Sequence, residues 1–330
     1  MTPRPLITLE EHFFSTAVPD TLRATYSEQL KHVDNVLAKL ADLGDVRRHD
    51  MDAGGVSLQV ISHGAGLSGH DTAVCRAAKD QLAAAIKAEE ARKGRFAGFA
   101  VAPMHNPDEA VAELRRAVRE QGFVGALVDN HCGGTFYDGA PYDVWWAAAE
   151  ELDVPVYLHP TWPSDDMGSH YEGNFSRVAA QSMASNGMGW HTETGLHVLR
   201  LFASGLFDRH PRLKVIIGHM GETIPFMLQR IQALSRRWGE FQRDFRTAYD
   251  ENIWITASGV WSLDPLRCIL ANTRLDHILY SVDYPFQTNE AGLEWIHELE
   301  KSGLIDEEQL NAIGYGNAEK LLVVRAPREK

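Results

Sequence analysis

Carboxylate and imidazole side chains interrupt four apolar runs of the sequence. They are Glu10 and His12 in "LEEHF", His159 in "YLHP", His219 in "IGHMGE" and Asp283 in "YSVDYPF". Because side chains alternate between the two faces of a strand, Glu10 and His12 would share one face, and Glu11 would point toward the helices as a structural partner. Nitrogen and oxygen ligands of this kind suit Zn²⁺ or Mn²⁺ and leave positions open for water or a substrate. The set therefore predicts a metal centre.

Each of these residues also has an ordinary structural explanation. Glu10 could be a solvated residue at a strand edge, and Asp283 before "YPF" could form a turn. His159 and His219 could be hydrogen-bonded histidines of the core. The prediction depends on whether the fold brings all five side chains together.

Eight short apolar runs alternate with longer stretches of helical periodicity. The runs cover residues 6–13, 56–62, 96–103, 123–130, 155–161, 214–220, 253–259 and 278–285, and helical patterns cover 107–121, 142–152 and 194–210. This alternation predicts parallel strands with crossover helices, and eight units in a chain of this length predict an α/β fold, the (β/α)₈ barrel. Barrel enzymes place their active sites at the carboxyl ends of the strands, where the five side chains would meet.

Two connections are much longer than the others. Residues 14–55 follow the first strand, and residues 162–193 follow the fifth. Loops of this length in a compact domain are usually functional or disordered, and these two would cover the barrel mouth as lids. No linker, low-complexity tract or internal repeat divides the sequence, which predicts a single domain over residues 1–330.

Composition narrows the class of partner. The 330 residues are 44% hydrophobic and carry a net charge of −13, which works against binding to nucleic acid or to an anionic membrane and favours a small molecule. Three cysteines without a CxxC spacing support neither a disulfide framework nor a cysteine zinc site, and they suggest a reducing interior. Charged residues interrupt the apolar N-terminal run, and no apolar run reaches 18 residues, so we expect a cytoplasmic protein.

The sequence resembles the metal-dependent decarboxylase branch of the amidohydrolase superfamily. This branch includes γ-resorcylate (2,6-dihydroxybenzoate) and other hydroxybenzoate decarboxylases and aminocarboxymuconate-semialdehyde decarboxylase. The resemblance covers essentially the whole chain. It is carried by "LEEHF", "MDAGGVSLQVIS", "GFVGALVDN", "LDVPVYLHP", "GLHVLRLFASGLFDRHPRLKVIIGHMGE" and "YSVDYPF". The E-x-H opening and the long segment around the sixth strand are the most specific of these motifs.

The resemblance implies roles for individual residues. It implies one divalent metal and no organic cofactor, with the ligands Glu10, His12, His159 and Asp283. His219 would stand beside the substrate, and Glu222 would fix its orientation by a hydrogen bond, although Glu222 could also be an acid at a helix N-terminus. Because a carboxylate replaces one imidazole of the H-x-H pair found in many hydrolases, Mn²⁺ or Mg²⁺ is favoured somewhat over the Zn²⁺ of an all-histidine site.

The implied reaction is non-oxidative loss of CO₂ from an ortho-hydroxylated aromatic acid, such as a salicylate or a 2,6- or 2,3-dihydroxybenzoate. Direct loss would leave an aryl anion, so the ring carbon must be protonated first, by Asp283 with help from His219. Residues expected to contact or wall the substrate are Phe13, His63, Trp190, Trp261 and Tyr284. For His63, a loop histidine without such a role is an equally good interpretation.

Two other functions fit the same residues. In a metal hydrolase of the same superfamily, acting on an ester, lactone or amide, Asp283 would be the general base for a metal-bound water. In a binding protein, the metal would only be structural. We expect a homodimer or homotetramer, on family resemblance and because Trp145 and Trp146 exceed what one buried helix face normally needs.

Overall fold

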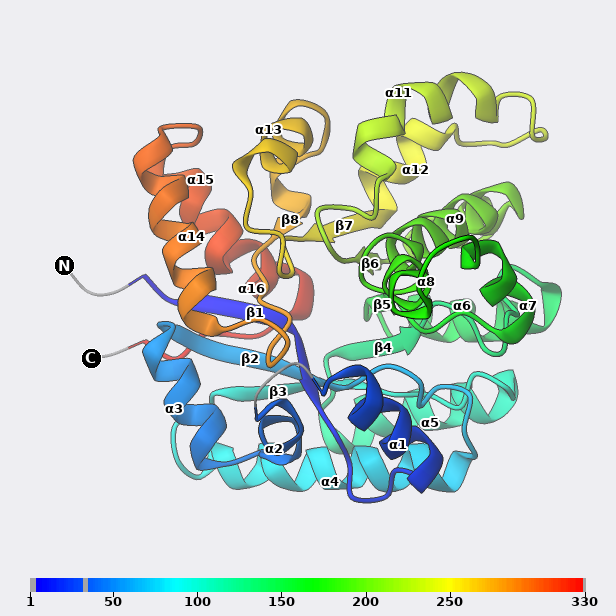
Figure 1. Cartoon of the computed structure of the whole chain (residues 1–330). Helices are drawn as coiled ribbons and strands as arrows, with labels where there is room; N and C mark the ends of the chain where they lie inside the picture. Colours follow the sequence, from blue (N-terminus) through cyan, green and yellow to red (C-terminus); the bar gives the residue numbers. More distant parts are fainter. Residues whose placement is uncertain (1–3, 32–34, 329–330) are drawn as a thin grey trace.

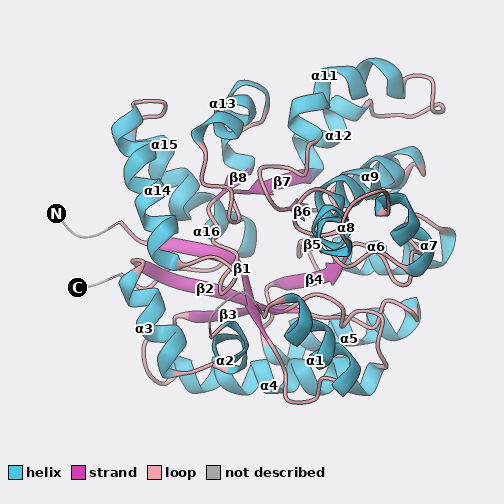
Figure 2. Cartoon of the chain, viewed as in Figure 1, coloured by secondary structure: helices cyan, strands magenta, loops and turns pink. Residues whose placement is uncertain are grey.

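The computed structural model describes residues 4–31 and 35–328 and arranges them around one sheet of eight parallel strands (Figure 1). The strands are β1 (Leu6–Phe13), β2 (Val56–His63), β3 (Phe96–Ala100), β4 (Gly125–Asp129), β5 (Val156–His159), β6 (Val215–Ile217), β7 (Ile253–Thr256) and β8 (Ile278–Leu279). Helices lie around this sheet and separate the strands along the chain (Figure 2).

The helices between the strands vary in length. The α-helices are α1 (Asp20–Gln29), α2 (Val36–Ala41), α3 (Asp45–Ala53), α4 (Thr72–Glu90), α5 (Pro107–Gln121), α6 (Asp143–Glu151), α7 (Asp165–Gly168), α8 (Arg177–Ala184), α9 (Gly189–Ala203), α10 (Leu206–Arg209), α11 (Ile224–Ser235), α12 (Phe245–Asn252), α13 (Leu263–Asn272), α14 (Asn289–Ser302), α15 (Glu307–Asn311) and α16 (Asn317–Leu322). Single turns of other helix types are η1 (Ala140–Tyr142), η2 (Ser169–Tyr171), η3 (Leu275–His277) and η4 (Ala312–Gly316). No helix of the described segments is long and apolar enough to cross a membrane.

Each strand pairs with the next one along the chain, from β1 to β8. The residues that follow β8 return to β1. Glu11 forms a parallel bridge with Tyr284, and the N–H of His12 donates to the carbonyl of Tyr284 at 2.7 Å. The predicted (β/α)₈ barrel is therefore confirmed.

Alternation along the strands divides the core into two layers. One apolar cluster takes alternate residues of the strands and fills the barrel interior; it contains Ile7, Leu9, Leu58, Val60, Ala97, Phe99, Leu127, Tyr157, Ile216 and Leu279, with Leu321 and Leu322 of α16 packed against them. A larger cluster lies between the strands and the helices. Because the strands are buried on both faces, they read as nearly continuous apolar runs in the sequence.

Local signals explain which helices could be predicted. Helix α5 has the expected bounds, 107–121, because the Asn106 side chain accepts from the N–H of Glu109, Pro107 opens the first turn, and Gly122 ends the helix at φ 74°. The helix expected over 194–210 is instead two helices. Helix α9 begins at Gly189 and ends at Ala203, and Gly205, at φ 74°, separates it from α10.

The two long connections both contain helices. Residues 14–55 hold α1, α2 and α3, and residues 162–193 hold α7, η2, α8 and the first residues of α9. In Figure 1, α7 and α8 lie to the right of the barrel, near β4 and β5. Both connections follow the carboxyl ends of their strands, the end at which the candidate metal ligands lie.

The two tryptophans of α6 are packed inside the chain. Trp145 and Trp146 are 0% and 1% exposed, and the indole N–H of Trp146 donates to the carbonyl of Tyr137 at 2.8 Å. The expectation that they exceed one buried face is wrong, because α5 packs against α6 and the connection before η1 covers it as well. These residues therefore give no support to an oligomer interface.

Candidate metal centre and active site

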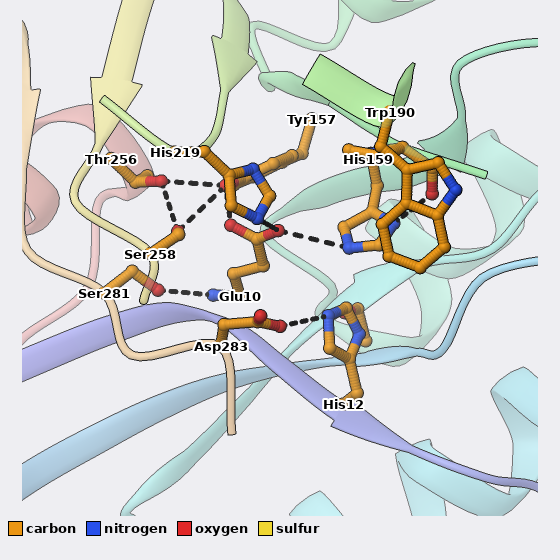
Figure 3. Close-up of polar contacts among 12 residues, drawn as sticks. Glu10, His12, Tyr157, His159, Trp190, His219, Thr256, Ser258, Ser281 and Asp283 are labelled. Atoms are coloured by element: carbon orange, nitrogen blue, oxygen red, sulfur yellow. Dashed lines mark hydrogen bonds and ion pairs between the residues drawn. The ribbon is translucent and has the colours of Figure 1, made fainter. Parts of the chain in front are cut away.

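Four side chains predicted as metal ligands meet at the carboxyl end of the barrel. Glu10 and His12 come from β1, His159 is the last residue of β5, and Asp283 lies four residues beyond the end of β8. One ligand atom from each lies within 4.8 Å of the others. Figure 3 shows the four side chains pointing toward one another.

An irregularity in β1 aims its two ligands. The pairing register between β1 and β2 shifts between Thr8 and Glu11, so three steps along β1 match two steps along β2. Ile7 and Leu9 belong to the barrel interior, and beyond the shift Glu10 and His12 face the same interior. Such bulges commonly redirect side chains beside active sites. The alternation of Glu10, Glu11 and His12 could be predicted, whereas the bulge could not.

Hydrogen bonds on the far side of each imidazole leave the near side free for a metal. Nδ1 of His159 donates to the carbonyl of Pro160 at 2.7 Å, which leaves the lone pair of Nε2 facing Oε1 of Glu10 at 3.1 Å. Nδ1 of His12 contacts Oγ of Ser62 at 3.3 Å, and its Nε2 lies 3.4 Å from Oδ1 of Asp283. Lone pairs therefore converge on one point.

Two of these converging atoms face other candidate ligands. Oε1 of Glu10 and Nε2 of His12 are buried and have no hydrogen-bond partner among the described residues. Burying such atoms without a partner is costly. A divalent cation between two carboxylates and two imidazoles would satisfy both atoms, so the residues present fit the implied metal.

Glu10 is held on its other side by the barrel wall. The hydroxyl of Tyr157 donates to Oε2 of Glu10 and contacts Oγ1 of Thr256 at 2.8 Å. The backbone N–H of Glu10 donates to Oγ of Ser281 at 2.8 Å. Burial would raise the pKa of Glu10, but the neighbouring imidazoles, above all that of His219, lower it below its usual range. Glu10 therefore presents one fixed, ionised oxygen to the centre.

The carboxylate of Glu11 points away from the centre and fixes the segment that carries Asp283. It accepts from Oγ of Ser281 at 3.2 Å and from the N–H groups of Val282 and Tyr284 at 3.1 and 3.3 Å. The expected structural role of Glu11 is thus what the structure shows. Asp283 adopts a φ of 72°, a conformation that non-glycine residues rarely take and that often marks functional sites.

His219 stands beside the ligands and is held by Glu222. Nδ1 of His219 lies 2.8 Å from Oε1 of Glu222, and Nε2 lies 3.8 Å from Oε1 of Glu10. Burial lowers the pKa of His219, but the charges of Glu222 and Glu10 outweigh it and raise the pKa to about 10. The hydrogen bond expected between His219 and Glu222 is present.

The turn that carries this pair is strained. His219, Met220, Glu222 and Thr223 all have positive φ angles, between 49° and 68°. Non-glycine residues adopt this region at a cost, and such strain concentrates at functional sites. It places the imidazole and its carboxylate partner on the same side of the turn.

Two residues expected to contact the substrate lie behind the strands instead. Phe13 shares the outward face of β1 with Glu11, and its ring meets that of His63 edge to face at 5.2 Å. Nδ1 of His63 donates to the carbonyl of Gly64 at 2.7 Å, and Nε2 accepts from the N–H of Ser15 at 3.1 Å. With both ring nitrogens bound to backbone, His63 has a structural role, and neither residue remains a pocket candidate.

Tyr284, a third residue expected at the substrate, also points away from the centre. A role of Trp261 in the substrate pocket stays a prediction. The Tyr284 hydroxyl donates to Oδ2 of Asp50 in α3 at 2.9 Å, so the ring points into the helical layer. Its neighbour Asp283, at φ 72°, faces the centre instead. The indole N–H of Trp261 donates to Oε1 of Gln287 at 3.2 Å, which ties this residue to the loop before α14.

Aromatic side chains do border the centre, but most of them were not predicted. In the view of Figure 3 the predicted Trp190 lies in front of His159. Trp162 meets Trp190 edge to face at 5.8 Å and meets Tyr26 at 5.1 Å. Phe286 lies 5.5 Å from the ring of His12. Trp162 and Phe286 follow β5 and β8 within a few residues, and that position was the available signal.

Comparison with known proteins places this centre in a family. A family model described as amidohydrolase matches residues 30–323. The chain belongs to the amidohydrolase family. Decarboxylase orsB of Emericella nidulans is 52% identical to it over 333 residues, covering 100% of both chains. Gamma-resorcylate decarboxylase of Rhodococcus jostii is 35% identical and covers 96% of this chain and 97% of its own.

A solved structure of the family has the same fold. A dihydroxybenzoic acid decarboxylase from a Polaromonas species, crystallised with manganese and the inhibitor 2-nitroresorcinol, superimposes with a TM-score of 0.84. It is 31% identical and covers 97% of each chain. The resemblance inferred from the sequence is confirmed, and with it the enzyme class, a decarboxylase.

Proposed function

We propose that this protein removes CO₂ from an ortho-hydroxylated aromatic carboxylic acid at a divalent metal held by Glu10, His12, His159 and Asp283. The observation that carries the proposal is the convergence of Oε1 of Glu10 and Nε2 of His12, two buried atoms without a hydrogen bond among the described residues, beside the His219–Glu222 pair. The named decarboxylases among the relatives, which include enzymes for dihydroxybenzoates, support the reaction class.

The metal we favour is Mn²⁺. The ligand set contains two carboxylates, which are harder donors than imidazole, and the Polaromonas relative holds manganese. Zn²⁺ and Mg²⁺ are the alternatives that a metal analysis would separate. When bound, the metal supplies positive charge that neutralises the phenolate and carboxylate of a chelating substrate.

The side chains then supply a proton to the ring. Oδ1 of Asp283 lies 3.4 Å from Nε2 of His12 at the centre, so the carboxyl group is placed to carry a proton to a ring bound there. Asp283 gives that proton to the ring carbon that bears the carboxylate, and the ortho-hydroxyl makes this carbon electron-rich. The electrons of the C–C bond return to the ring, and CO₂ leaves. His219, held by Glu222, assists this proton transfer.

The most direct test is a substrate panel with two measured products. The enzyme loaded with Mn²⁺ should release equal amounts of CO₂ and phenol from 2-hydroxylated or 2,6-dihydroxylated benzoates and be inert toward 4-hydroxybenzoate. His159→Ala should lose most of its bound metal and its activity. Hydrolysis of an ester, lactone or amide without any release of CO₂ would instead favour the hydrolase alternative, with Asp283 as general base.

We also propose that the chain forms a homo-oligomer, for a reason other than the one expected. Large apolar side chains are exposed on two helices and beside them: Val178 is 71% and Phe226 82% exposed, and Phe175 is 49% exposed. Exposed apolar patches commonly mark interfaces between proteins. Two or four copies remain alternatives.

A further inference from the structure

His191 is a site residue that the sequence did not reveal. It lies in the first turn of α9, at the end of the long connection after β5. Its Nδ1 lies 2.8 Å from Oε2 of Glu222, and its Nε2 lies 3.2 Å from the carbonyl of Asn186. Its ring meets that of His219 edge to face, with centroids 4.6 Å apart. Each carboxylate oxygen of Glu222 therefore contacts the Nδ1 atom of one imidazole.

These contacts are hydrogen bonds rather than a second metal site. His191, His219 and Glu222 are close enough together to be considered as ligands of an ion. Both Nδ1 atoms, however, lie 2.8 Å from a carboxylate oxygen, the ordinary distance of a charge-assisted hydrogen bond. Ligands at about 2.0–2.2 Å from a tetrahedral metal stand farther apart than this. The pair of imidazoles and the carboxylate form a closed hydrogen-bonded unit.

The orientation of His219 depends on this unit. Glu222 is fully buried, and the two imidazoles outweigh the effect of burial and lower its pKa, so it accepts from both as a carboxylate. A carboxylate held at both oxygens cannot rotate about its terminal bond. Without His191, Oε2 would lose that donor, and Glu222 could turn and carry the imidazole of His219 with it.

We propose that His191 is a positioning residue that holds Glu222 in place and thereby aims Nε2 of His219 at the reacting carbon. The inference rests on the proposed decarboxylation. It also gives the connection of residues 162–193 a function, because this connection supplies His191 and Asn186 to the unit. The imidazole of His219, which follows β6, is thus held in place by the segment that follows β5.

Kinetics of three variants test the catalytic part of this proposal. In metal-replete His191→Ala, kcat should fall about 10- to 100-fold with KM nearly unchanged, because a small misplacement of a reacting group is costly while metal and substrate binding are kept. His191→Gln, which keeps an N–H donor, should recover part of the loss. His170→Ala removes an exposed histidine of the same connection and should match the wild type. Wild-type kcat in His191→Ala, or two metals per chain in the wild type, would overturn the proposal.

A spectroscopic measurement tests the geometry without any substrate. In protein labelled with ¹⁵N-histidine, the Nδ1–H proton of His219 should resonate far downfield because it is bonded to a carboxylate. This signal should shift or disappear in His191→Ala and stay unchanged in His170→Ala. An unchanged signal in His191→Ala would overturn the positioning role, even if no hydroxybenzoate proves to be a substrate.

Discussion

At the scale of single residues, the centre is defined by which lone pairs are left free. Nδ1 of His159 donates a hydrogen bond to the carbonyl of Pro160, and Oε2 of Glu10 accepts one from the hydroxyl of Tyr157. Each residue therefore has one remaining atom, and both atoms point to the same place. Groups that orient ligands from behind in this way commonly set metal affinity.

Removing the hydroxyl of Tyr157 should therefore weaken metal binding. We expect Tyr157→Phe to raise the Kd for Mn²⁺ about 10- to 100-fold, the usual effect of losing a group that orients a ligand. Titration of the metal-free protein with Mn²⁺, followed by calorimetry or by electron paramagnetic resonance of free Mn²⁺, measures this directly.

Tyr280→Phe is the matched control for that variant. Tyr280 is also fully buried, but its hydroxyl has no hydrogen-bond partner among the described residues. It should bind Mn²⁺ as the wild type does. If both variants bind equally well, or lose affinity equally, then Tyr157 does not orient Glu10.

Among the secondary-structure elements, ion pairs join neighbouring helices of the outer layer. Glu113 of α5 is 1% exposed and lies 2.9 Å from Nζ of Lys79 in α4, and Arg76 of α4 contacts it as well. Burial raises the pKa of Glu113, but its hydrogen bonds with Arg76 and Lys79 outweigh this and lower the pKa to about 2. This carboxylate joins two neighbouring helices.

The low pKa of Glu113 predicts how stability depends on pH. A carboxyl group with a depressed folded-state pKa stabilises the fold fully above its unfolded value, near 4.5, and this contribution is lost as the pH falls toward 2. Metal-free Glu113→Gln should therefore be less stable than the wild type at pH 7, and the gap should close as the pH falls from about 4.5 to 2. Urea unfolding at several pH values measures it.

An exposed acid on α14 provides the comparison. Glu298→Gln should show no gap at any pH, because Glu298 is exposed. A difference between Glu113→Gln and the wild type that stays constant down to pH 2 would mean that the ionised carboxylate is not what stabilises α4 against α5.

Some features of the elements and of the site could be predicted from the sequence, and others could not. The strands, the bounds of α5 and the convergence of the four candidate metal ligands were predictable, because apolar runs, caps and strand ends are local features. The bulge in β1 was not, since it appears only in the pairing of β1 with β2. His191 could not be placed because it reaches Glu222 through the path of a long connection. The outward face of Phe13 follows from alternation that we applied only to Glu10, Glu11 and His12, whereas Tyr284 lies beyond β8, next to Asp283 with its φ of 72°.

At the scale of the whole molecule, barrel closure is what creates the site. It brings Glu10 against Ser281 and His12 against Asp283, residues about 270 positions apart in the chain. Apolar side chains on α8 and α11 are left exposed, because a single chain does not cover them. We expect these side chains to lie in the interface of the proposed oligomer.

Light scattering tests this expectation. At micromolar concentration we expect a particle of two or four times 36.8 kDa, and we expect Phe226→Ser, which changes the most exposed of these aromatic side chains, to shift the equilibrium toward the monomer. Val323→Ser, which removes an equally exposed apolar side chain at the end of α16, is the control. A wild-type particle of 36.8 kDa would reject the oligomer.

The proposed reaction replaces the carboxylate of an ortho-hydroxylated acid by a proton that comes from solvent and is added at the same ring carbon. Turnover of 2,6-dihydroxybenzoate by the Mn²⁺-loaded enzyme in D₂O, with the product examined by mass spectrometry and NMR, tests it most directly. We expect one deuterium per product molecule, at the carbon that carried the carboxylate, together with one CO₂. Failure to release CO₂ from any ortho-hydroxylated benzoate, or equally rapid turnover of 4-hydroxybenzoate, would contradict it.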